Sequence, residues 1–252
     1  MFDHIVHPPP TPQDLSSDAV INGANPLVMR QLAVVCGAGS RSEQLERWYL
    51  FVRDAIRYDP FLINLKPEEN AASRTLENQS GHCVHKSVLL VAGFRALGVP
   101  ARLGLARVRN HLAASSLELK LGTDVLTPHG YVAFWNGQRW VKCTPVFNRA
   151  LCEKLGTSPL EWDGEQDVLF QPLDRNGDRF MEYLEDYGLF NSWPMELICG
   201  QLQEMYPHAF NAAGEWQLQR KGIIAAVLWY RCPLVSPERF WPPRQRLLLQ
   251  RI

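Results

Sequence analysis

The sequence lacks any run of apolar residues long enough to cross a bilayer, which takes about 20 residues in a helix. Residues 1–13 carry Asp3, two histidines and three consecutive prolines. They have neither the basic start nor the apolar centre of an export signal. Lysine plus arginine total 26, as do aspartate plus glutamate, so no net charge attracts nucleic acid or an anionic membrane. We therefore expect no nucleic-acid partner and no membrane association.

Closely spaced cysteine pairs are also missing. The six cysteines stand at positions 36, 83, 143, 152, 199 and 232, and none forms a Cys-x-x-Cys pair. In a chain without an export signal, scattered cysteines are typical of reduced thiols, which predicts a cytoplasmic protein. The sequence implies no cofactor and no resident metal, and it leaves the oligomeric state open.

The composition is that of a globular protein, with 46% hydrophobic and 21% charged residues among 252. No internal repeat is present, and this length suits one large domain or two small ones. We expect an N-terminal arm over 1–30, a single domain over 31–232 and a Pro- and Arg-rich tail over 233–252. The acidic, irregular segment 157–190 is expected to lie across the domain as a strap. Arg102, Arg107 and Arg109 are expected either to form ion pairs with this segment or to be solvated.

Apolar periodicity predicts the main elements of the domain. Apolar residues at helical spacing predict helices over 42–58 and 83–97, and residues 195–206 are expected to add a late element. Alternation with a period of two predicts strands over 101–108, 129–135 and 138–145, and Asn136-Gly137 predicts a hairpin between the last two. Residues 60–79 are expected to be irregular, and 221–230 a late element. The centre of the domain is thus predicted to be a buried helix followed by an antiparallel sheet.

Cys83 opens the central helix, a position that favours a thiolate. The unpaired N–H groups and the dipole of a helix start contribute about 0.3–1 kcal/mol, whereas one pKa unit is about 1.36 kcal/mol. Lowering a thiol pKa of about 8.5 to a useful value therefore needs more than the helix. A histidine close enough to act as base or to form an ion pair is required.

His129, at the start of a strand, is the preferred base. His82 and His85 are close to Cys83 in sequence, but neighbouring side chains on a helix point in different directions. A base also needs a group that orients its other ring nitrogen, and Thr144, Asn148 and Asp124 are the candidates.

Four motifs together resemble the core of the transglutaminase-like superfamily. They are Gly81-His-Cys-Val-His-Lys-Ser87, Phe94-Arg-Ala-Leu-Gly-Val-Pro-Ala-Arg102, His129-Gly-Tyr-Val132 and Gly137-Gln-Arg-Trp-Val-Lys-Cys-Thr-Pro145. The resemblance covers about residues 40–148. It implies a papain-like α+β fold in which a cysteine-bearing helix packs on an antiparallel sheet.

The resemblance also implies site residues: Cys83 as the nucleophile and His129 as the general base. The family usually carries Asp where this sequence has Thr144. A hydroxyl can orient an imidazole but cannot neutralise an imidazolium, so Asn148 stays an alternative for the third position. The backbone N–H of Cys83, with help from Gln79, is expected to meet the oxyanion.

These residues suggest thiol-dependent acyl chemistry on a peptide or glutamine carboxamide, resolved by water or by an amine. A peptide or protein is the expected substrate. Two other readings remain open. Thr144 favours a binding module that keeps the fold but has lost efficient catalysis. His82, Cys83 and His85 together suggest a metal-dependent hydrolase.

Overall fold

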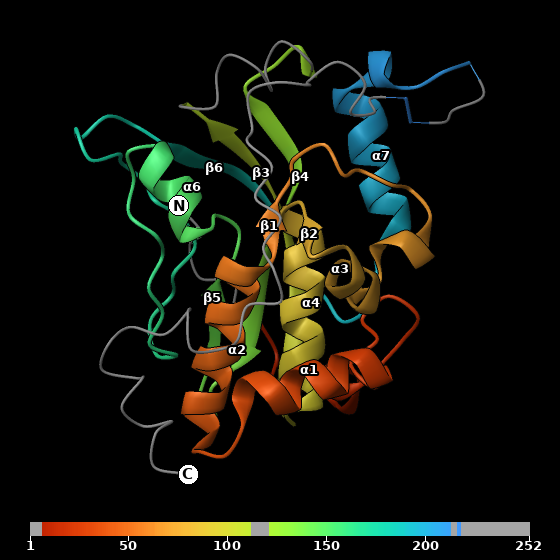
Figure 1. Ribbon diagram of the computed structural model, residues 1–252. Coiled ribbons are helices and arrows are strands. Elements are labelled where there is room, and N and C mark those ends of the chain that lie inside the picture. Colours follow the sequence, from red (N-terminus) through yellow and green to blue (C-terminus); the bar gives the residue numbers. More distant parts are fainter. Residues whose placement is uncertain (1–6, 112–120, 213–215, 218–252) are drawn as a thin grey trace.

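The structure is a computed structural model that describes residues 7–111, 121–212 and 216–217 (Figure 1). The long helix α4 (Cys83–Ala96) packs on a four-stranded antiparallel sheet of order β5-β4-β3-β6. The strands are β3 (Ala101–Asn110), β4 (Val125–Trp135), β5 (Trp140–Cys143) and β6 (Met181–Phe190). The predicted α+β fold, with a cysteine-bearing helix on an antiparallel sheet, is therefore confirmed.

The remaining elements surround α4. The helices are α1 (Pro26–Cys36), α2 (Arg41–Ala55), α3 (Ala72–Asn78), α6 (Arg149–Lys154) and α7 (Met195–Met205). Short 3-10 turns lie at Pro12–Leu15, Pro67–Asn70 and Pro207–Ala209, and the strands β1 (Arg57–Tyr58) and β2 (Ser80–Gly81) pair in parallel. No helix of the described ranges is long and apolar enough to span a membrane.

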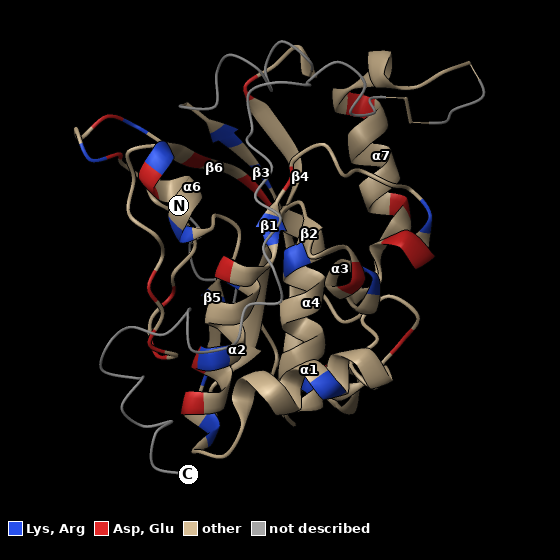
Figure 2. Cartoon of the chain, in the orientation of Figure 1, with Lys and Arg blue, Asp and Glu red and all other residues tan. Residues whose placement is uncertain are grey.

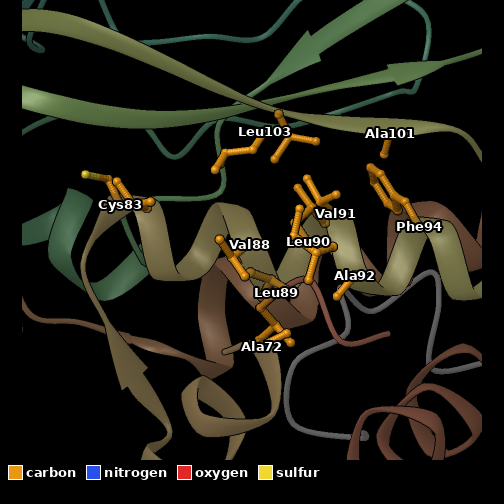
Figure 3. Packing of buried hydrophobic residues seen from close by; sticks show 14 of the residues in the cluster. Ala72, Cys83, Val88, Leu89, Leu90, Val91, Ala92, Phe94, Ala101 and Leu103 are labelled. Carbon is orange, nitrogen blue, oxygen red and sulfur yellow. The ribbon is translucent and has the colours of Figure 1, made fainter. Parts of the chain in front are cut away.

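Helix α4 is buried on almost every side. Val88, Leu89, Leu90 and Val91 cover more than a full turn and are all inaccessible to solvent. Figure 3 shows side chains of α4 facing both the sheet above it and α3 below it. A helix that is apolar all round belongs in a core, so its first residue is held in a fixed place relative to the sheet.

The sheet register follows the predicted hairpin. Trp135 pairs with Trp140 across the Asn136-Gly137 turn, and Gly137 has φ of 100°, a value that favours glycine. Strand β4 begins earlier than predicted, at Val125, and pairs with β3 over almost its whole length. The long β3–β4 pairing extends the sheet beneath the start of α4.

Two expectations about the chain's course need correction. The segment 157–190 is not a strap throughout, because 181–190 forms the edge strand β6. This segment does pair with arginines of β3, through Arg107–Glu185 and Arg109–Glu182. Residues 60–79 are also not irregular throughout, since they contain α3.

The N-terminal region is integrated into the domain from about residue 12 onward. Asp14 is fully buried and forms a bidentate ion pair with Arg102, at 2.7 and 2.8 Å. Val20 and Ile21 belong to the main core, and the boundary expected at residue 31 falls inside α1. The predicted element 221–230 and tail 233–252 lie outside the described residues.

Candidate active site

Cys83 is the first residue of α4, which His82 caps. Nδ1 of His82 accepts a hydrogen bond from the Val84 N–H at 3.1 Å, and the His82 N–H donates to Nδ1 of His85 at 3.4 Å. This reciprocal pairing satisfies backbone donors that a helix start otherwise leaves open, here with histidines in place of the usual Ser/Thr and Glu. The cap fixes where the helix begins and hence where the thiol lies.

The Cys83 sulfur lies against the backbone of β4 on both sides of His129. Sγ is 3.8 Å from the carbonyl oxygen of Pro128, and the backbone N–H of Gly130 also faces it. Gly130 permits this approach, because a Cβ there would lie 2.7 Å from the Cα of Val84. A glycine after the histidine therefore lets the helix start pack directly on the strand.

Burial keeps both the thiol and the imidazole uncharged at neutral pH. It raises the pKa of Cys83 to about 11, although backbone N–H groups of Gly130, Val84 and Cys83 oppose the rise. Burial also lowers the pKa of His129 to about 4. In the resting site the thiol and the imidazole are therefore both neutral.

His129 points into the interior of the domain. It lies opposite Ala106 of β3, and its ring meets that of Tyr183 edge-on with centroids 6.0 Å apart. Nδ1 of His129 is buried and makes no hydrogen bond to a described residue. No hydrogen bond among the described residues joins His129 to Cys83. The structure thus brings the start of α4 to the His129 segment without closing a Cys–His hydrogen bond.

Thr144 follows the end of β5 and is buried. Its N–H donates to the Val168 carbonyl at 3.0 Å, and its carbonyl accepts from the Tyr49 hydroxyl at 3.3 Å. Burial raises the pKa of the Tyr183 phenol, and the neighbouring Thr144 hydroxyl opposes that rise. The Thr144 side chain therefore lies beside Tyr183 and does not hydrogen-bond His129.

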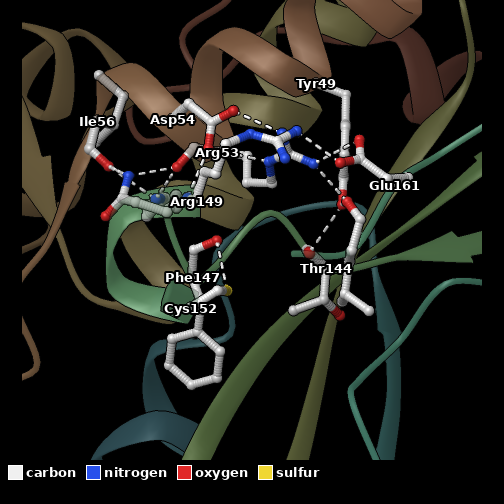
Figure 4. A network of polar contacts seen from close by, with 12 residues as sticks. Tyr49, Arg53, Asp54, Ile56, Thr144, Phe147, Arg149, Cys152 and Glu161 are labelled. Atoms are coloured by element: carbon white, nitrogen blue, oxygen red, sulfur yellow. Dashed lines mark hydrogen bonds and ion pairs between the residues drawn. The ribbon is translucent and has the colours of Figure 1, made fainter. Parts of the chain in front are cut away.

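Asn148 is used elsewhere, at the end of α2. Its amide nitrogen donates to the carbonyls of Arg53 and Ile56, and its oxygen accepts from the Tyr58 N–H at 2.9 Å. Figure 4 shows the polar network around Arg53, which includes Asp54 and Ile56. Since these bonds engage both ends of the carboxamide, the structure does not bring Asn148 to His129.

The other expected helpers also lie apart from His129. Asp124 pairs with Arg109, at 3.1 Å. Gln79 is exposed and ends α3 in a left-handed conformation, with φ of 49°. Neither residue makes a hydrogen bond to His129 or to Cys83 among the described residues.

His82 is closer to the sulfur than helix geometry suggested. Its Nδ1 lies 3.9 Å from Sγ of Cys83, because His82 caps the helix with an extended backbone and is not part of it. Burial, followed by the neighbouring His85 and His129, lowers the pKa of His82 well below its usual range. Within the described ranges, no three His, Cys, Asp or Glu side chains are grouped so that they could hold a metal ion.

A mostly apolar pocket opens onto Cys83, and no motif of the sequence pointed to it. Its walls come from the 58–70 loop, the start of α4, the first half of β4 and α7. The lining includes Tyr58, Ile63, Cys83, Leu126, Ile198 and Leu202. Tyr183, which packs on His129, was also missed. The late element predicted at 195–206 was the available clue to the pocket, but the sequence alone does not show which part of the sheet this element covers.

The comparisons with known proteins agree with the motifs. Residues 30–145 match the family described as the Transglutaminase-like superfamily. No curated protein matches the chain. A solved structure from Cytophaga hutchinsonii, described as a "Putative Cysteine Protease", is 13% identical with a TM-score of 0.40. The match covers 73% of this chain and 60% of that protein, so this chain spans less than two thirds of its length.

Proposed function

We propose that this chain, whose residues 30–145 carry the transglutaminase-like superfamily core, is a thiol enzyme that acts on amides through an acyl-Cys83 intermediate. The observation that carries the proposal is the position of Cys83. Its sulfur lies at a helix start and against the backbone on both sides of His129. A buried cysteine with a purely structural role needs neither feature.

The chemical step follows from a site that is neutral at rest. The sulfur attacks the amide carbon while the imidazole of His129 takes the thiol proton. The C–N bond then breaks as the imidazolium returns that proton to the leaving amine, which leaves a thioester on Cys83. Attack by water releases an acid, whereas attack by a second amine forms a new amide.

Backbone donors around the sulfur supply charge stabilisation. The N–H groups of Cys83 and Gly130 face Sγ, and Cys83 lies at the positive end of α4, whereas the Val84 N–H is already taken up by His82. When sulfur bonds to a carbonyl carbon, the oxyanion forms close to the sulfur. Preorganised N–H groups in a water-poor site are suited to stabilise it.

His129 is the better candidate for the base, although His82 is the rival. Nδ1 of His82 already accepts the Val84 N–H, so its lone pair is committed to the helix cap. Nδ1 of His129 is buried and makes no hydrogen bond to a described residue, so this ring nitrogen, unlike Nδ1 of His82, is not committed to the helix cap. We therefore assign proton transfer to His129 and helix capping to His82.

A second candidate is a binding module that retains the fold but catalyses weakly. The observation in its favour is the absence of a carboxylate at position 144, together with a Thr144 side chain that serves Tyr183. An imidazolium formed during attack is then stabilised less than in a Ser-His-Asp arrangement. This reading predicts ligand binding without turnover.

We propose a peptide or protein substrate and a reducing, cytoplasmic setting. Five cysteines in the described residues are free, and four of these are buried. With equal numbers of acidic and basic residues, the chain has no net charge to attract nucleic acid.

Turnover of peptide anilides, with and without a fluorescent primary amine, tests the proposal. We expect anilide release by the wild-type chain at least 100-fold faster than by Cys83→Ser, and the products separate hydrolysis from amine transfer. Release no faster than in Cys83→Ser, together with no amine incorporation, would overturn the enzyme reading and favour the binding module.

A further inference from the structure

The pocket beside Cys83 has no charged side chain among its described lining residues. Figure 2 shows acidic positions on α7, but Glu196 and Glu204 of that helix are not part of the lining. His82 does line the pocket, and it is uncharged at neutral pH because burial lowers its pKa. A charged substrate group would therefore find no partner there.

Two polar groups of the lining are already engaged inside the protein. The Tyr206 hydroxyl donates to the Val125 carbonyl at 2.9 Å and accepts from the Thr127 N–H at 3.0 Å. The Asn70 amide donates to the carbonyls of Asn64 and Lys66, each at 2.8 Å. A carboxamide that entered the pocket beside these two groups would lose water without gaining equivalent hydrogen bonds from them, which is unfavourable.

Helix α7 supplies the apolar wall, and it is held firmly in place. It packs against β4 (Figure 1), with Ile198 and Leu202 facing the pocket. Gln201, on the same helix, accepts hydrogen bonds from Arg107 of β3 and Tyr187 of β6. This wall lies outside residues 30–145, so it is a feature of this chain's C-terminal part and not of the matched core.

From these observations we propose that the pocket binds an apolar side chain of the acyl donor, next to the carbonyl that Cys83 attacks. The inference rests on the proposed function, because only an acyl donor that Cys83 attacks would place its side chain in this pocket. The pocket selects substrates with an aliphatic or aromatic side chain in that position over substrates with glutamine or a charged residue there. Burying such a side chain is favourable, and the preformed wall requires little rearrangement.

Binding to the full chain carrying Cys83→Ala tests this without catalysis. The ligands are the N-acetyl amides of leucine, phenylalanine, glutamine and lysine, followed by titration calorimetry or NMR. We expect the leucine or phenylalanine amide to bind at least tenfold more tightly than the glutamine and lysine amides. Leu202→Gln and Trp193→Ala, both in the pocket wall, should each reduce that preference at least fivefold. Leu184→Gln, an exposed site on β6, serves as the control and should not change it.

The outcomes separate the two proposals. Equal binding of all four amides, or a preference unaffected by both wall variants, would overturn the apolar pocket. Trp193 is only partly buried, so Trp193→Ala gives a result even if Leu202→Gln does not fold. An apolar preference in a chain whose wild-type form shows no acyl transfer supports the pocket and contradicts the proposed enzyme.

Discussion

Two buried polar clusters flank α4, and they differ in how completely they are hydrogen-bonded. The cluster at the end of α2 consists of Arg53, Lys86 and Asn148. Lys86 is fully buried, and its Nζ donates to the carbonyls of Arg53 and Ile56 at 2.8 and 2.7 Å. The Arg53 guanidinium pairs with Asp54 and donates to a backbone carbonyl (Figure 4). These polar side chains have partners in the structure.

The cluster at the sheet consists of Cys83, His129 and Thr144. Here Nδ1 of His129 is buried without a hydrogen bond, and the thiol has only weak contacts near 3.8 Å. Burying unsatisfied polar groups costs stability, whereas satisfied ones hold a structure together. The comparison assigns a folding role to the α2 cluster and is consistent with the chemical role that we propose for the sheet cluster.

The largest stability change from a single substitution is expected in the α2 cluster. Asn148→Leu keeps the branched shape but leaves the Tyr58 N–H without a partner and removes one of two hydrogen bonds to each of the Arg53 and Ile56 carbonyls, which costs about 2–3 kcal/mol of unfolding free energy. Urea denaturation measures this change. Turnover per folded molecule should stay within threefold of wild type. Asn176→Leu, in an exposed turn, is the control. A loss of turnover above 100-fold in a folded Asn148→Leu protein would assign Asn148 to the site after all.

Acid should weaken the fold through buried histidines. Burial lowers the pKa of His85 and of His129 to about 4. The unfolded chain therefore takes up protons below about pH 6.5, whereas the folded chain does so only near pH 4. The contribution of these two histidines to the free energy of unfolding is complete above pH 6.5 and is lost as pH falls. At pH 5 each histidine has lost about 2 kcal/mol of it.

Denaturation at pH 7 and at pH 5 measures that loss. His85→Phe should remove its share of the pH dependence. An unchanged pH dependence in this variant would show that His85 is not buried and neutral as described.

The smallest effect is expected at Thr144. Thr144→Val removes a hydroxyl that does not hydrogen-bond His129, so kcat/KM should change by less than tenfold. Thr157→Val, at another fully buried threonine hydroxyl, is the matched control for stability. A drop of 100-fold or more at Thr144 alone would mean that this hydroxyl orients His129 during turnover.

Sequence reasoning predicted the fold well where periodicity was strong. Cys83–Ala96 is apolar on all faces and has a Gly-x-Pro stop, and the Asn136-Gly137 turn fixes the hairpin register, so both elements were predictable. The edge strand β6 was not, since its alternation is broken by acidic residues that pair with arginines of β3. Helix α3, of seven residues, is too short for a clear helical period.

The site was predictable only in part for similar reasons. Motif order led to Cys83 and His129, but the distance of His82 from the sulfur depends on the backbone of a cap residue. Tyr183 reaches His129 from a strand 54 positions later in the chain, and α7 reaches the pocket from further still. Such tertiary contacts leave no local pattern in the sequence.

Trapping the acyl-enzyme tests the central claim most directly. The full chain is mixed with an activated phenylalanyl ester, quenched in acid within seconds, and digested for mass spectrometry. Three forms are compared: wild type, His129→Asn and His82→Asn, the last of which keeps a good helix cap. We predict a thioester on Cys83 that forms at least 100-fold more slowly in His129→Asn and within fivefold of wild type in His82→Asn. Acylation of another cysteine such as Cys199, or a rate unchanged in His129→Asn, would contradict the account.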